Sequence, residues 1–220
     1  MLSAELINDL IPPLKIADSG ERALLLMNDF KVSHLPVVEK NNFLGIISED
    51  DILEMQDTDD AISTIPLNFT HTFIHGWQHL YDAMKLMSVN KLSVVPILDD
   101  KEQYLGLIST HSLISYFAEM ASVTNPGAII ELEIAQHNYS LSEIARIVES
   151  NDAHILSSYI NSSSDSSKIE VTIKIDKEDV SGILQTFQRF NYVAHSFYQD
   201  KQDNDDTMNR FDSFMKYLNI

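Results

Sequence analysis

Two stretches of this sequence are near copies of each other: GIISEDDIL at residues 45–53 and GLISTHSLI at residues 106–114. Each copy has a glycine, two apolar residues and a serine, which is Ser48 in the first copy and Ser109 in the second. Three residues later, the first copy has Asp51 where the second has Ser112. An apolar run that ends in serine predicts a strand followed by a helix, because serine caps helices and acids favour their first turn. The spacing of Ser48 and Asp51 also predicts a capping box.

The similarity extends to both sides of these copies, so that Pro36 corresponds to Pro96. Each copy has apolar residues at helical spacing, followed by two short apolar runs with polar turn residues between them. This pattern predicts a helix, a strand hairpin and a second helix, with hairpin strands at residues 35–38 and 43–47 and at residues 94–98 and 104–108. We therefore predict two tandem repeats, residues 1–60 and residues 61–124.

Residues 125–200 have a different pattern and predict a separate domain, which an Asn-Pro-Gly turn introduces. The expected elements are a strand at 128–135, a helix at 140–150, strands at 153–160 and 168–175, a helix at 178–190 and a strand at 192–198. This βαββαβ order predicts a ferredoxin-like sandwich, with Ser140 and Glu143 as a capping box. Residues 201–220 predict an acidic linker and an amphipathic helix at 208–218. The whole chain is thus expected to be α/β (α+β).

Composition restricts the classes of function. Hydrophobic residues make up 44% of the 220 positions, which is enough for a packed core. No apolar run reaches the ~18 residues of a membrane span, and the N-terminus does not resemble a signal peptide. The absence of cysteine excludes disulfides and fits a cytoplasmic protein. The formal net charge of −18 repels phosphate backbones, so we expect no nucleic-acid partner, although one small nucleotide in a pocket is compatible with it.

Three histidines, His71, His75 and His79, would share one face of a helix and could then bind a metal. The residues between them do not have a helical pattern, so we predict no metal site there. The acidic residues 57–60 lack the glycine and spacing of a calcium loop. No nucleophile, phosphate-loop or zinc-protease motif is found. We therefore expect no cofactor, no metal and no catalytic activity.

The order of helix, proline-containing strand, turn, glycine-to-serine corner and helix resembles the CBS domain, and two copies resemble a Bateman module. This resemblance covers roughly residues 8–120. The βαββαβ order after it resembles an ACT domain, and the combination resembles the acetoin-utilisation accessory proteins of bacteria. The turn at residues 136–139 lacks the glycine of many amino-acid-binding ACT domains, which favours dimerisation over amino-acid sensing. The resemblance implies a regulatory homodimer that binds an adenine nucleotide (AMP, ADP, ATP or S-adenosylmethionine) and relays this binding to the ACT-like domain or to a partner protein.

In CBS domains, the serine and aspartate of this corner hold a ribose. The resemblance thus implies a nucleotide site at Ser48 and Asp51, with further contacts from Ile16, Ala17, His34 and Leu35. It also implies a weaker second site at Ser109, His111 and Ser112. Because serine carries no charge, we expect the second ribose contact to be weaker by about 1–3 kcal/mol.

Two interpretations of the first corner remain open on the residues alone. Ser48 and Asp51 bind a ligand, or they only cap a helix and the protein is a ligand-free dimeric interaction scaffold.

Overall fold

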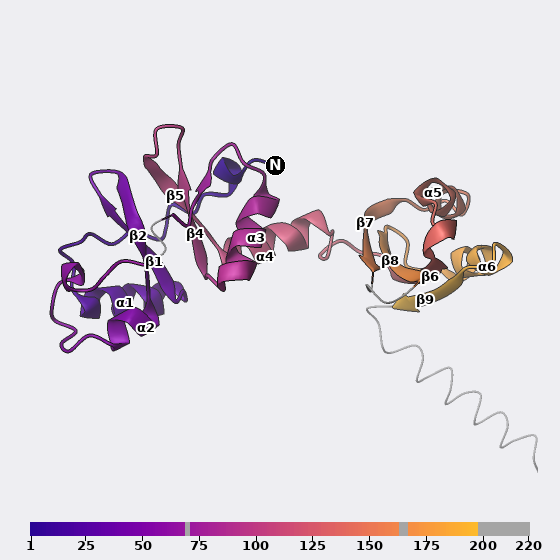
Figure 1. Cartoon of the computed structure of the whole chain (residues 1–220). Coiled ribbons are helices and arrows are strands. Elements are labelled where there is room, and N and C mark those ends of the chain that lie inside the picture. Colours follow the sequence, from indigo (N-terminus) through magenta and orange to yellow (C-terminus); the bar gives the residue numbers. More distant parts are fainter. Residues whose placement is uncertain (69–70, 163–166, 198–220) are drawn as a thin grey trace, which may run out of the picture. The chain divides into compact units, whose positions relative to one another are not determined.

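The computed structural model describes residues 1–68, 71–162 and 167–197. The chain forms two compact units, Met1–Tyr116 and a second unit that begins at Phe117 (Figure 1). The predicted helix at 208–218 lies outside the described residues, as does most of the loop between the second and third strands of the second unit. Among the helices that the structure describes, none is long and apolar enough to cross a bilayer.

The first repeat contains helix α1 (Gly20–Phe30), strands β1 (His34–Glu39) and β2 (Asn42–Ser48), and helix α2 (Glu49–Leu53). Helix α1 begins after Ser19, whose side chain accepts a hydrogen bond from the backbone of Arg22. Strands β1 and β2 form an antiparallel hairpin in which His34 lies opposite Ser48. The predicted order of helix, hairpin and helix is confirmed, although α2 is short.

The second repeat contains strand β3 (Ile74–His75), helix α3 (Leu80–Asn90), strands β4 (Val94–Leu98) and β5 (Tyr104–Ser109), and helix α4 (Thr110–Met120). The β3–β4–β5 sheet pairs β3 parallel to β4 and β4 antiparallel to β5. Helices α1 and α3 end in the same way, at Lys31 and Lys91, both in the left-handed conformation. The repeat in the sequence is therefore a repeat in backbone geometry.

The segments that precede the two repeats are exchanged between them, which the sequence analysis did not predict. Helix η1 (Ser3–Leu6) lies against the second repeat, where the Asn8 N–H donates to the Leu107 carbonyl at 2.8 Å. Helix η2 (Ile62–Thr64) lies against the first repeat, where the Ile46 N–H donates to the Asn68 carbonyl at 3.0 Å. Each repeat is thus completed by a segment that precedes the other repeat in the sequence.

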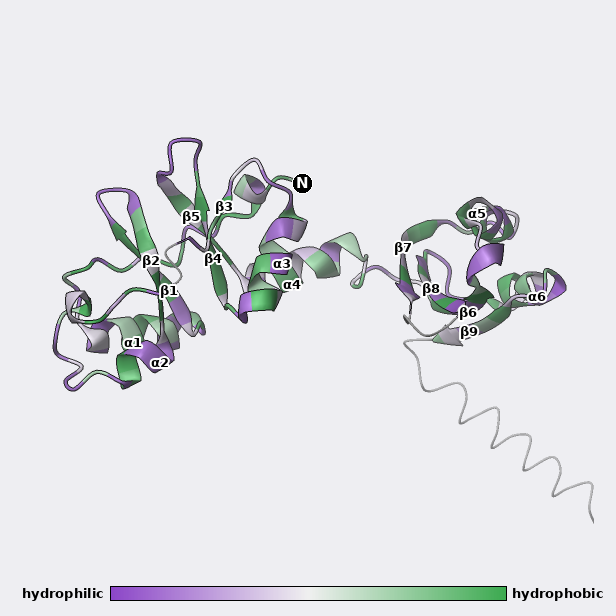
Figure 2. Cartoon of the chain, in the orientation of Figure 1, coloured by the Kyte–Doolittle hydropathy of each residue, from purple (hydrophilic) through white to green (hydrophobic). Residues whose placement is uncertain are grey.

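The two repeats also share a hydrophobic core. Val94 and Leu107 of the second repeat pack in one buried cluster with Leu14, Leu35 and Ile47 of the first. Figure 2 shows the hydrophobic colour along the strands and the hydrophilic colour at the tips of both hairpins. Burial of apolar area from both repeats stabilises them as one unit.

The second unit contains β6 (Ile129–Ala135), η3 (Gln136–Asn138), α5 (Leu141–Glu149), β7 (Ile155–Ser162), β8 (Lys168–Ile175), α6 (Ser181–Arg189) and β9 (Val193–Phe197). Its antiparallel sheet has the order β7–β8–β6–β9, and α5 and α6 cover one face (Figure 1). This arrangement confirms the predicted ferredoxin-like fold. The capping box predicted for α5 is wrong in one half. Ser140 accepts from the Glu143 N–H, but the Glu143 carboxylate instead accepts from the Tyr192 hydroxyl at 2.7 Å.

Candidate functional site

The first corner, where β2 ends and α2 begins, is built by Ser48 and Asp51. The Ser48 hydroxyl oxygen accepts from the Asp51 N–H at 3.1 Å, and Asp51 Oδ2 accepts from the Ser48 N–H at 2.8 Å. The Ser48 hydroxyl also donates to Asp51 Oδ2 at 2.6 Å. The predicted capping box is therefore confirmed. Both side chains are half-buried, and the helix N-terminus stabilises the carboxylate.

Asp51 has a second partner, Asn68, which the sequence analysis missed. The Asn68 side-chain amide donates to Asp51 Oδ1 at 2.9 Å. A signal for this residue was present in the sequence. Asn8 and Asn68 stand at corresponding positions before the two repeats, and both form antiparallel bridges to the last strand of a hairpin.

The second corner, where β5 ends and α4 begins, keeps the cap without the charge. Ser109 accepts from the Ser112 N–H at 3.1 Å, and the two hydroxyl oxygens lie 2.9 Å apart. Ser109 is 2% exposed, whereas Ser48 is half-buried. His111 is exposed on the first turn of α4. The two corners thus share a backbone arrangement and differ in the charged acceptor that only the first one has.

His34 connects the first corner to the second repeat. Its Nδ1 accepts from the Ser93 N–H at 3.3 Å, so this nitrogen carries no proton. The same nitrogen lies 3.1 Å from the Ser33 hydroxyl and 3.2 Å from the Ser93 hydroxyl. Burial lowers the pKa of His34, while Asp51 and Asp50 act in the opposite direction. The arrangement favours a neutral imidazole beside the acidic corner.

A sequence comparison decides the family of this unit. The model of the CBS domain family matches residues 9–57 and 78–119, which include both corners. The two matched segments form a tandem pair of CBS domains. The unit that follows the pair has the ferredoxin-like strand order expected of an ACT-like domain.

Individual proteins resemble this CBS pair. MJ1232 of Methanocaldococcus jannaschii is 28% identical over an alignment of 112 residues, with 45% of this chain and 38% of that protein covered. A CBS domain pair/ACT domain protein from Thermotoga maritima has 18% identity and a TM-score of 0.49, with 54% of this chain and 98% of that chain covered. The structure of CBSX2 in complex with AMP has 19% identity and a TM-score of 0.46, with 54% and 96% covered. The matched part of the chain therefore spans less than half of the length of this curated relative.

The remaining residues of the predicted first site have different surroundings. Leu35 is fully buried in the CBS core. Ile16 and Ala17 follow Leu14, which pairs with Val37 in the parallel direction. Parallel pairing directs the chain after Leu14 toward the hairpin turn, at the opposite end of β1 from the first corner. The structure therefore groups His34 with the corner, and a ligand contact from Ile16 or Ala17 stays a prediction.

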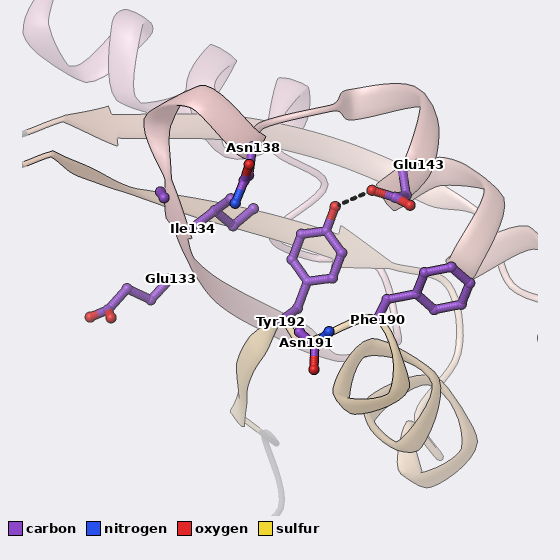
Figure 3. Close-up of a pocket in the computed structure, with 8 residues that line it drawn as sticks. Glu133, Ile134, Asn138, Glu143, Phe190, Asn191 and Tyr192 are labelled. Atoms are coloured by element: carbon purple, nitrogen blue, oxygen red, sulfur yellow. Dashed lines mark hydrogen bonds between the residues drawn. The ribbon is translucent and has the colours of Figure 1, made fainter.

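The ACT-like domain has a pocket of about 410 Å³ at the end of β6 (Figure 3). It is lined by Glu133, Ile134, Ala135, Asn138, Glu143, Phe190, Asn191 and Tyr192. Burial, followed by the hydrogen bond to Glu143, raises the pKa of Tyr192 to about 12. Glu143 also pairs with Arg146 at 3.7 Å, and Figure 3 shows the Glu133 carboxylate pointing away from Tyr192. The Tyr192 hydroxyl and the Glu143 carboxylate in this pocket therefore already have protein partners.

The histidines considered for a metal site have separate roles. His79 caps α3 by accepting from the Tyr81 N–H, and the His75 ring stacks on Trp77 at 5.6 Å. In the described parts of the chain, no three His, Cys, Asp or Glu side chains form a group that could hold a metal ion.

Proposed function

We propose that this protein is a non-catalytic regulator whose CBS pair binds an adenosine-containing ligand at the first corner. The observation that carries the proposal is the carboxylate of Asp51, held at a helix N-terminus beside the Ser48 hydroxyl. A carboxylate accepts hydrogen bonds from both hydroxyls of a ribose. The second corner has only Ser109 and Ser112, so the proposal assigns it the weaker binding.

The regulatory mechanism in this proposal is a population shift. Ligand would bind one arrangement of the two repeats more tightly than another and pass this bias to the ACT-like domain or to a partner protein. The link of His34 to Ser93 supports the proposal, because it joins the first corner to the second repeat through hydrogen bonds. We further propose that the protein acts as a cytoplasmic homodimer, which light scattering after gel filtration can test.

The proposal is tested by titrating the protein with AMP, ADP, ATP and S-adenosylmethionine in a calorimeter. Wild type is compared with Asp51→Ala and with the matched control Ser112→Ala at the second corner. Loss of the ribose acceptors should cost about 1–3 kcal/mol, or roughly five- to 150-fold in affinity. We expect Asp51→Ala to show this loss at the tighter site, and Ser112→Ala to keep the wild-type affinity of that site. Equal affinity of the tighter site in all three proteins contradicts the assignment to the first corner.

One observation supports the alternative, a ligand-free interaction scaffold. Both oxygens of Asp51 already accept hydrogen bonds within the chain, as a purely structural cap requires. The same titrations separate the two functions, since the scaffold predicts no heat and no change in melting temperature with any of the four ligands.

A further inference from the structure

Asn68 occupies the outward side of the first corner. Its carbonyl accepts from the Ile46 N–H at 3.0 Å, which anchors its backbone to β2. Its side-chain amide donates to Asp51 Oδ1 at 2.9 Å. Asp51 Oδ2 already accepts both the N–H and the hydroxyl of Ser48. Oδ1 is therefore the oxygen that a ligand must share or take over.

We propose that Asn68 competes with the ribose hydroxyls of the ligand for Asp51 Oδ1, so that ligand binding displaces the Asn68 side chain. This inference rests on the proposed nucleotide function and names a residue that sets its affinity. Asn68 is exposed, so its amide can exchange Asp51 for water when a ligand arrives. Each carboxylate oxygen accepts about two hydrogen bonds, and Oδ2 already accepts two from Ser48, so both ribose hydroxyls must bind Oδ1. This leaves no place for the Asn68 amide on Oδ1, while the bonds that support the cap through Oδ2 need not break.

The competition also connects the ligand site to the second repeat. Asn68 belongs to the segment that joins the repeats, and this segment is bonded to the first repeat through Ile62 and Ser63 as well. The Ile62 N–H donates to the Asp18 carbonyl at 2.9 Å. A ligand that displaces the Asn68 side chain removes one of the bonds that hold the connection on the first repeat. Occupancy of the site is thereby coupled to the connection between the repeats.

The other repeat provides a matched control at Asn8. Asn8 makes the equivalent antiparallel bridge, to Leu107, but its side-chain oxygen accepts from the Leu10 N–H at 2.9 Å. The corner beside it has Ser112 and therefore offers no carboxylate. Substitution of Asn8 therefore shows how the loss of an asparagine side chain at this position affects the protein when no carboxylate is contested.

The experiment is calorimetric titration of the full chain with AMP, using wild type, Asn68→Ala and Asn8→Ala. One part-exposed hydrogen bond to a carboxylate predicts roughly three- to ten-fold tighter binding for Asn68→Ala. Asn8→Ala should bind like wild type. In an Asp51→Ser background, Asn68→Ala should change the affinity less than twofold, because the contested oxygen is gone. A purely structural effect of Asn68 would persist in that background.

The possible outcomes separate the inference from the function on which it depends. If wild type and Asn68→Ala bind AMP equally, or if the variant binds more weakly, the competition is wrong while the nucleotide function stands. If neither protein binds AMP, the titration is repeated with ADP, ATP and S-adenosylmethionine, and the absence of binding to all four overturns both. If Asn68→Ala does not fold, the inference is tested on wild type instead, by following the side-chain amide signal of Asn68 in the NMR spectrum. That signal must shift on saturation with AMP, and an unchanged signal refutes displacement.

Discussion

Replacing Asp51 with serine gives the first corner the same side chains as the second. This variant tests whether the carboxylate stabilises the fold in addition to its proposed role in ligand binding. Asp51 accepts two hydrogen bonds from Ser48 and one from Asn68. At the second corner, the serine side chain makes one bond, hydroxyl to hydroxyl at 2.9 Å. Asp51→Ser should therefore lose the bonds to the Ser48 N–H and to Asn68, together with the favourable charge at the helix N-terminus.

The size of the effect follows from these contacts. A net hydrogen bond contributes about 0.5–1.5 kcal/mol, and a charge at a helix terminus about 0.3–1 kcal/mol. Asn68 is exposed and Asp51 is half-buried, so water replaces part of what is lost. We expect a loss of about 1–2 kcal/mol in the free energy of unfolding of the first unit, or roughly 4–8 °C in its melting temperature.

The assay can observe the first unit by itself, because Trp77 is the only tryptophan of the chain. Its ring stacks on His75, so unfolding of this unit changes its surroundings and its fluorescence. Urea unfolding is followed by this signal for wild type, Asp51→Ser and the control Ser112→Ala. The slope with denaturant must stay the same for the midpoints to report stability.

The control variant distinguishes the charged cap from an uncharged one. Ser112→Ala removes one neutral hydroxyl bond and should cost less than half as much as Asp51→Ser. If the two variants lose equal stability, or if Asp51→Ser loses less than about 0.3 kcal/mol, the charged cap does not stabilise the fold in the way argued from its contacts.

Three further predictions concern other parts of the chain. Gly127 has φ of 130°, and a Cβ there would lie 1.9 Å from the Ile175 carbonyl oxygen. Gly127→Ala should therefore destabilise the second unit by at least about 1–3 kcal/mol in thermal unfolding. As a control, Gly182→Ala within helix α6 should change the free energy of unfolding by less than about 1 kcal/mol. Burial lowers the pKa of His34 from its ordinary 6.5, so the first unit should lose stability as the pH falls below 6.5, and His34→Gln should flatten this slope in urea unfolding. The raised pKa of Tyr192 means that the second unit should lose stability as the pH rises from 10 to about 12, and circular dichroism should show a smaller loss for Tyr192→Phe.

Much of the fold was predictable because it depends on local patterns. The hairpin strands and the βαββαβ order follow from short apolar runs between turn residues, and the corner follows from the capping of a helix by Ser48. Capping acts over three residues, so the pair of Ser48 and Asp51 could be recognised without any tertiary information. The surroundings of Asp51 could not, since Asn68 lies 17 residues away in the sequence.

The two repeats, the acid at only one corner and the order of elements in the ACT-like domain could all be recognised in the sequence. These features are periodic or local, so short stretches of the sequence are enough to predict them. Three features depend on tertiary packing: each repeat is completed by the segment preceding the other, His34 bonds to Ser93, and Glu143 bonds to Tyr192 rather than to its own helix cap. Packing of the core brings these partners together, and buried hydrogen-bonding groups pair with the partner that lies near. The residues that form these hydrogen bonds are far apart in the chain, so no short sequence pattern predicts them.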